Sequence, residues 1–162
     1  MEFLQDFFFD DTSNINSISV DLSIKSEILN PTIITKDLSL QPTRAWTKGE
    51  KYRGKTKNIK TNKIEECWRE RPWGIWGFNT GEKIKSKSIH EHVELLLNYF
   101  KAKKDILKKY LANKDHFSIC ISIIFNTKIE IGGFAFKNDI LKELSELSHY
   151  IDFRFLLNKP NI

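Results

Sequence analysis

Hydrophobic and polar residues alternate with a period of two in several short stretches of this sequence. In residues 17–24, Ile18, Val20, Leu22 and Ile24 fall on one face, with two serines and an aspartate between them. This period is typical of a strand that buries one face. Related patterns predict further strands in residues 73–78, 117–125, 129–136 and 151–157.

A helical period of apolar residues separates these strands. Asn30, followed by a proline, predicts the N-cap and first turn of a short helix. The longest helix is predicted to begin near Ser88, which would form a capping box with Glu91, and its apolar stripe continues to Leu111. Asn138 is predicted to cap a third helix that precedes the last strand.

The order of these elements is strand, helix, strand, long helix, strand, strand, helix, strand. It predicts an α+β fold: a mainly antiparallel sheet with helices packed on one face. Each half contains strand, helix and strand, which suggests an internal pseudo-repeat. The chain has 162 residues, the length of one ordinary domain. We predict an N-terminal aromatic and acidic arm over residues 1–16 and a single domain over residues 17–162.

Residues 47–72 break the pattern with a long polar segment rich in Lys, Asn and Thr. They are predicted to form a basic insertion loop. The surrounding residues 44–87 carry thirteen Lys and Arg against five Glu, a net charge of +8, whereas residues 1–43 carry −5 and residues 88–162 carry +2. Positive charge is therefore concentrated in the middle of the chain, and that asymmetry calls for a functional explanation.

Cysteine content and hydropathy indicate a cytoplasmic protein. The two cysteines are Cys67 and Cys120, and Cys120 lies in an apolar run where a free thiol behaves as a small hydrophobic group. A disulfide framework is not expected, which favours a reducing compartment. The N-terminal segment is acidic on both sides of its apolar residues, unlike a secretory signal. We also expect no membrane span, because no run approaches the ~18 apolar residues that one requires.

Three stretches resemble a bacterial family catalogued as domain of unknown function 4279. The most specific is Leu38 to Glu50, which reads Leu-Ser-Leu-Gln-Pro-Thr-Arg-Ala-Trp-Thr-Lys-Gly-Glu. The second is Trp73-Gly-Ile-Trp76, followed by a helix that contains His92-Val-Glu-Leu-Leu-Leu. The third runs from Phe117 to Leu157. The resemblance extends over most of the chain from Ser17. It supports the predicted fold, and it implies no activity, because the family has none established.

Sequence-local signatures of catalysis are missing. There is no Gly-x-Ser-x-Gly elbow, and neither cysteine has a histidine beside it. His90 and Glu94 are four residues apart and would share a helix face. A polar first helical turn explains them better than a metal site, which needs three or four converging ligands. We therefore predict no catalytic residue, no metal site and no cofactor.

Two kinds of binding fit the basic, tryptophan-rich segment. Arginine and tryptophan together have the composition of a protein interface, and cations beside planar side chains also suit a nucleic acid. We expect a non-catalytic bacterial protein-binding module, in concrete form an immunity protein that neutralises a cognate toxin. A nucleic-acid-associated protein is the alternative, and an enzyme whose site assembles only in three dimensions is the third. The candidate binding residues are Arg44, Trp46, Lys48, Lys51, Arg53, Trp68, Arg71, Trp73 and Trp76. For Trp73 and Trp76 a place in the core or at its edge is the competing expectation, because a tryptophan side chain buries a large area.

The N-terminal arm carries a second apolar cluster that requires a cover. Its members are Phe3, Leu4, Phe7, Phe8 and Phe9. They either fold back on the domain, or dock on a partner or on a second copy of the chain. The sequence leaves this choice and the oligomeric state open.

Overall fold

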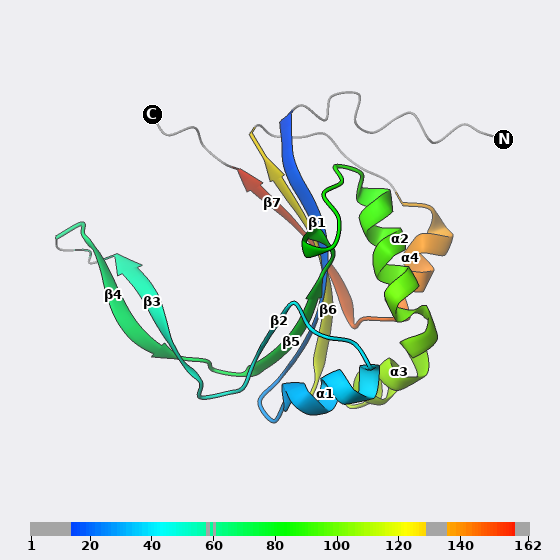
Figure 1. The fold of residues 1–162 in the computed structure, drawn as a ribbon, viewed down its shortest axis with the longest axis horizontal. Coiled ribbons are helices and arrows are strands. Elements are labelled where there is room, and N and C mark those ends of the chain that lie inside the picture. The colour runs from blue at the N-terminus through cyan, green and yellow to red at the C-terminus, as the bar shows by residue number, and fades with distance from the viewer. Residues whose placement is uncertain (1–13, 58, 60, 129–135, 158–162) are drawn as a thin grey trace.

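A five-stranded sheet and a separate two-stranded ribbon organise the chain (Figure 1). The computed structural model describes residues 14–57, 59, 61–128 and 136–157. The α+β class predicted from the sequence is confirmed. In chain order the elements are β1 (Ile15–Ser26), α1 (Pro31–Leu38), β2 (Arg44–Trp46), β3 (Lys51–Lys57), β4 (Ile64–Glu70), β5 (Gly74–Asn79), a 3-10 turn (Thr80–Glu82), α2 (Ile89–Phe100), a 3-10 turn (Lys101–Lys103), α3 (Lys104–Ala112), β6 (Ser118–Thr127), α4 (Asn138–Ser145) and β7 (Tyr150–Leu157).

The strand order in the large sheet is β2-β5-β1-β6-β7. Neighbours are antiparallel except β6 and β7, which are parallel because the chain returns through α4 between them. Both halves therefore contain strand, helix and strand. In the first half β5 separates β1 from β2, so β2 runs parallel to β1 without touching it, and the two halves differ in topology.

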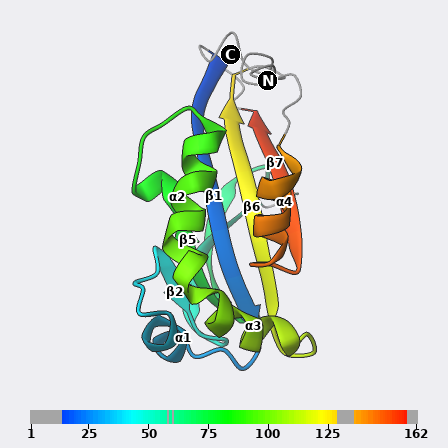
Figure 2. The ribbon, with the colours of Figure 1, turned by 90° about the vertical axis from the view of Figure 1, so that its right-hand side faces the viewer.

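The hydrophobic core lies between the sheet and the helices. Figure 2 shows α2 and α4 lying over β1 and β6 on this face. The alternation predicted for β1 places Leu22 opposite Phe78 and Ile24 opposite Trp76 of β5, with all four side chains buried. Phe78 and Trp76 both meet the ring of Phe100 from α2 edge-on. One face of β1 packs against the helices, and this explains why apolar residues recur at every second position of its sequence.

The first helix forms as its sequence predicts. The Asn30 side chain accepts a hydrogen bond from the Thr32 N–H at 3.0 Å, and Pro31 occupies the first turn. Ile34 and Leu38 face the core, and Ser39 ends the helix with a left-handed backbone. This cap fixes the direction in which the chain reaches β2.

The predicted capping box of the longest helix is wrong. Ser88 has the extended backbone of an N-cap, yet its side chain makes no capping hydrogen bond. The Ser88 N–H donates instead to the Ser86 hydroxyl at 2.9 Å, which forms a local turn before the helix. The helix also ends at Phe100, and α3 follows after a 3-10 turn. Tyr110 of α3 then donates to Asp37 of α1, which ties these two helices together.

One further prediction needs adjustment at the C-terminal end. The helix α4 begins at Asn138, so the N-cap is Lys137 and the predicted cap is displaced by one residue. The closing strand is confirmed as β7, and it lies at the edge of the sheet. The predicted strand over 129–136 falls almost entirely on residues outside those that the structure describes, and so does the apolar cluster of the N-terminal arm.

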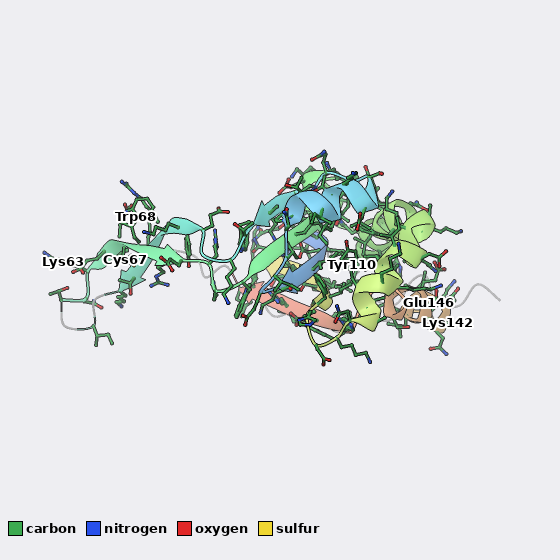
Figure 3. The ribbon with its side chains drawn as sticks, turned by 90° about the horizontal axis from the view of Figure 1, so that it is seen from below. Lys63, Cys67, Trp68, Tyr110, Lys142 and Glu146 are labelled. Atoms are coloured by element: carbon green, nitrogen blue, oxygen red, sulfur yellow. The ribbon has the colours of Figure 1, made fainter. Side chains whose placement is uncertain are left out.

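Residues 47–72, predicted as a loop, instead form largely an antiparallel ribbon of β3 and β4, and we call residues 47–72 the arm. Its register pairs Lys51 with Glu70 and Lys57 with Ile64. Figures 1 and 3 show the arm projecting away from the domain, with Lys63 and Trp68 far from Tyr110 and Glu146. Both faces of the arm meet solvent over most of their length, so no hydrophobic alternation marks its strands, and the sequence pattern was mistaken for a loop.

Candidate functional site

The arm joins the domain through a sandwich of three side chains. Arg71, which follows β4, has its guanidinium carbon 4.0 Å from the ring centroid of Trp46 in β2 and 3.9 Å from that of Tyr52 in β3. The Gly49 N–H donates to the Arg71 carbonyl at 2.8 Å, and the Arg71 N–H donates to the Glu50 carbonyl at 3.0 Å. Stacking and backbone hydrogen bonds thus hold the arm at the end of β2.

The turn into the arm depends on glycine. Gly49 has a φ of 81°, in the left-handed region that glycine enters without steric cost. The N–H of Thr47 donates to the Glu50 carboxylate across this turn at 3.3 Å. The Lys-Gly-Glu sequence that follows Trp46 therefore has a structural role, because it reverses the chain between β2 and β3.

The second anchor of this region is an ion pair on the sheet face opposite the helices. Arg44 of β2 donates to the Asp21 carboxylate of β1 at 2.5 Å, and Asp21 is only 1% exposed. Burial raises the pKa of the Asp21 carboxyl, and the guanidinium groups of Arg44 and Arg154 oppose that shift only in part. The predicted binding residue Arg44 is thus occupied in holding β2 to the sheet.

Two more predicted residues are engaged near the same edge. Lys48 donates to the Glu27 carboxylate at 2.6 Å, and this hydrogen bond lowers the pKa of that exposed carboxyl. The ammonium of Lys25 lies 3.2 Å from the ring centroid of Trp73. Trp73 is 38% exposed, so its side chain remains accessible although Lys25 lies over the ring.

The structure removes Trp76 from the binding surface. Trp76 is fully buried, and its indole N–H donates to the Thr35 hydroxyl at 3.0 Å. Its ring packs against Phe100 in the core. The sequence grouped Trp76 with Trp73 because the two are close along the chain, but in β5 Trp76 points toward the helices.

Trp68 is the most exposed tryptophan of the predicted site. It lies in the middle of β4, is 66% exposed, and has Arg53 of β3 opposite it in register. The Arg53 guanidinium carbon is 5.4 Å from the Trp68 ring centroid. Hollows of about 750 Å³ and 270 Å³ adjoin this side chain, the first lined by Lys51, Trp68, Arg69 and Glu70 and the second by Arg53, Glu66, Cys67 and Trp68.

The arm carries the net charge of the protein. Residues 47–72 contain nine Lys and Arg against four Glu, a net charge of +5 that equals the charge of the whole chain. Within the arm the charge is unequal between strands. β3 has four basic residues and no acidic one, whereas β4 has three Glu and one Arg. One long edge of the arm is therefore basic and the other is weakly acidic.

Sequence reasoning missed the partners that position these residues. Asp21, Lys25 and Tyr52 each hold a predicted residue, yet none was among the candidate binding residues. A usable signal existed only for β3, where Lys51, Arg53, Lys55 and Lys57 alternate with other residues at the period of a strand. Contacts such as that of Trp46 with Arg71 join residues far apart in sequence, so no local pattern reports them.

The histidine-rich first turn of α2 has a structural role. His92 is buried, with its Nδ1 2.8 Å from the Thr80 hydroxyl and its Nε2 3.0 Å from the Ser86 carbonyl. Because a carbonyl only accepts, Nε2 donates to the Ser86 carbonyl, and in the neutral ring Nδ1 then accepts from the Thr80 hydroxyl. Within the described residues, no group of three or more His, Cys, Asp or Glu is placed to hold a metal ion, and no helix is long and apolar enough to cross a membrane.

Comparison with known proteins gives a family and no further relative. No curated protein and no solved structure matches the chain. The family model described as domain of unknown function (DUF4279) matches residues 16–158, from the start of β1 to just past β7. The chain therefore belongs to the DUF4279 family.

Proposed function

We propose that this protein is a non-catalytic module that binds another protein through its arm. The observation that carries the proposal is the arm itself: a two-stranded ribbon that no other described layer covers, with Trp68 exposed on it. An isolated ribbon is marginally stable in water. A segment that gains so little from its own folding is retained for what it contacts, and projecting loops and ribbons commonly carry recognition.

The chemistry of the arm suits a protein surface. Tryptophan, tyrosine and arginine dominate protein-interface hot spots, and here Trp68 lies over Arg53 while Arg71 stacks between two rings. Two hollows flank Trp68 and offer places for partner side chains. The basic charge of β3 indicates a partner with an acidic surface, because complementary charge steers association.

The ion pairs argue against phosphate binding as the main role. Of the five basic residues predicted for the site, Arg44, Lys48 and Arg53 have carboxylate partners within the chain and Arg71 is stacked between rings. When Lys or Arg neutralises a phosphate, counterions condensed on the nucleic acid are released, and this release drives binding. A cation already paired with a carboxylate must first give up that partner, so it gains less from binding a phosphate.

In biological terms, we propose that the protein acts by covering the surface of its partner. Neutralisation of a cognate toxin, as an immunity protein performs it, is the concrete form of this proposal. Such a protein needs no catalytic group, only a stable domain and a projecting recognition element. A coding sequence for a toxin-like protein directly upstream of this gene would support this form, and co-expression with that toxin would test it by the survival of the cells.

The protein-binding proposal is tested by capture from the native host. Tagged wild-type protein and the variant Trp68→Ala are compared, with Leu141→Ala as the control, because Leu141 is an exposed apolar residue on α4. We expect a protein retained by the wild type and the control and lost from Trp68→Ala. Equal retention by all three would contradict the role of the arm.

Nucleic-acid binding remains the second candidate, because the arm holds a net charge equal to that of the whole chain. A labelled RNA or DNA duplex and single strand, titrated at about 50 mM salt, separate the two proposals. Binding that falls steeply with salt and is lost on Trp68→Ala would favour this candidate. Undetectable binding at that salt concentration would remove it.

A further inference from the structure

We propose that the outer edge of β3 receives an extended acidic segment of the partner as an added β-strand. This inference rests on the proposed function and names the way in which the arm recognises its partner. It commits to one edge of the arm and to one chemistry of the ligand. Each choice follows from the position of the arm and from its charge.

The edge of β3 is available for strand addition. β3 pairs with β4 on one side, and no described strand lies on its other side. A strand at the edge of a sheet presents unpaired N–H and C=O groups along its outer side. Recognition by strand addition uses these groups for affinity and the alternating side chains for specificity. The seven residues of β3, Lys51–Lys57, are long enough to pair with a short peptide segment.

The side chains of β3 specify an acidic ligand. Lys51, Arg53, Lys55 and Lys57 are exposed at every second position, so they share one face of the strand. Arg53 already has a carboxylate partner in Glu66 at 3.7 Å, so the three lysines supply most of the attraction. Their spacing is about 6.8 Å, twice the rise per residue of an antiparallel strand. A ligand strand with Asp or Glu at every second position repeats that spacing when it pairs antiparallel with β3, the more stable of the two directions. It then places opposite charges side by side.

The other edge of the arm rejects the same ligand. β4 carries Glu65, Glu66 and Glu70 with a single arginine, so an acidic strand beside it would meet like charges. The same argument disfavours pairing of β3 with β3 of a second copy. Among the described strands, the acidic β4 of a second copy is the one that fits, and such pairing would repeat from copy to copy because it does not close.

The binding experiment uses a synthetic peptide of about ten residues with Glu at every second position and Thr or Val between. Fluorescence anisotropy of the labelled peptide measures its affinity for the full-length protein. A peptide with the same residues but all Glu placed together, and one with Lys in place of Glu, are the controls. We expect at least tenfold tighter binding of the alternating peptide, because only its charges match the spacing of β3.

Backbone methylation separates strand addition from charge attraction. Two alternating peptides are methylated on the amide nitrogens, one at odd and one at even positions. Alternate amides of a strand point to the same side, so methylation in one register should abolish binding and in the other should preserve it. Equal affinities for both methylated peptides would overturn strand addition.

Variants of the protein locate the edge. We expect Lys55→Glu to weaken binding of the alternating peptide by about tenfold or more, because it places like charges side by side. Lys142→Glu on α4 is the matched control, and Figure 3 shows Lys142 at the opposite end of the molecule from the arm. Equal loss in both variants, or in neither, would refute the assignment to β3.

Two outcomes of these experiments would contradict an acidic partner strand at the β3 edge. Scattering mass that grows with concentration in the wild type and is lost in Lys55→Glu would assign the edge to a second copy and overturn the acidic-partner proposal. A captured protein that depends on Trp68 while no acidic peptide binds would refute strand addition and leave the proposed function standing.

Discussion

Removing the guanidinium of Arg71 should loosen the arm without unfolding the domain. Arg71 stacks on Trp46 at 4.0 Å and on Tyr52 at 3.9 Å. Each cation–π contact contributes about 0.5–2 kcal/mol. The buried Nε–H of Arg71 has no acceptor among the described residues, and a buried donor without a partner costs about 1 kcal/mol or more. Arg71→Leu removes two contacts that together contribute about 1–4 kcal/mol and relieves about 1 kcal/mol. The net loss therefore lies between about 0 and 3 kcal/mol, with the middle of that range at about 1–2 kcal/mol.

The loss should be local because the arm has no core of its own. A ribbon opens separately from the domain when few buried contacts connect them. A loss of 1–2 kcal/mol then raises the amide hydrogen exchange of β3 and β4 about 5- to 30-fold, since about 1.4 kcal/mol corresponds to a factor of ten. Hydrogen–deuterium exchange followed by mass spectrometry measures the arm, and thermal unfolding measures the domain.

Lys25→Ala provides the matched control. It also removes a cation from a tryptophan ring, at 3.2 Å from the centroid of Trp73, but that ring belongs to the side of the sheet. Its arm amides should exchange as in the wild type. If Arg71→Leu left the exchange of the arm unchanged, or lowered the stability of the domain and the arm together, the sandwich would not be the joint that we describe.

Three further predictions test the ion pair and the two helix N-termini. Because burial raises the pKa of Asp21, the folded state retains its proton to higher pH than the unfolded state, so this group lowers stability as the pH rises from about 3.8 through that raised pKa. Over this pH range, the free energy of urea unfolding of the wild type should fall with rising pH relative to that of Asp21→Asn. Identical pH profiles of the two proteins would contradict this prediction. Asn30→Ala should cost about 1 kcal/mol, because its side chain caps α1. Ser88→Ala should change the free energy of urea unfolding by less than about 0.5 kcal/mol, because its side chain caps nothing, and a loss equal to that of Asn30→Ala would refute this assignment.

The sequence predicted those parts of the fold that bury one face. β1 and β6 alternate in hydrophobicity because their inner residues, such as Val20 and Ile121, meet the helices. β7 shows the same alternation at the edge of the sheet, where Phe153 and Phe155 stay partly exposed. α1 carries its own cap in Asn30. These signals are local, and a single sequence contains them. The class of the fold follows from their order.

The arm and its joint could not be predicted in the same way. A ribbon with solvent on both faces has no reason to alternate in hydrophobicity, so only the alternating charges of β3 were present to indicate a strand. The joint depends on Arg71 reaching Trp46 and Tyr52 across a turn, and the ion pair depends on Arg44 reaching Asp21 of a strand that is not its neighbour in the sheet. Such contacts follow from the topology and not from spacing along the chain. For Trp76 the fold decides between the two expectations and places the residue in the core.

The most direct test of the account is the exchange of arm amides in the free protein and in its complex with the captured partner. If the arm is the recognition element, partner binding should slow deuterium uptake in β3 and β4 and leave the helices α1 and α4 unchanged. Protection confined to the helices or to the large sheet, with the arm exchanging as in the free protein, would contradict the central claim.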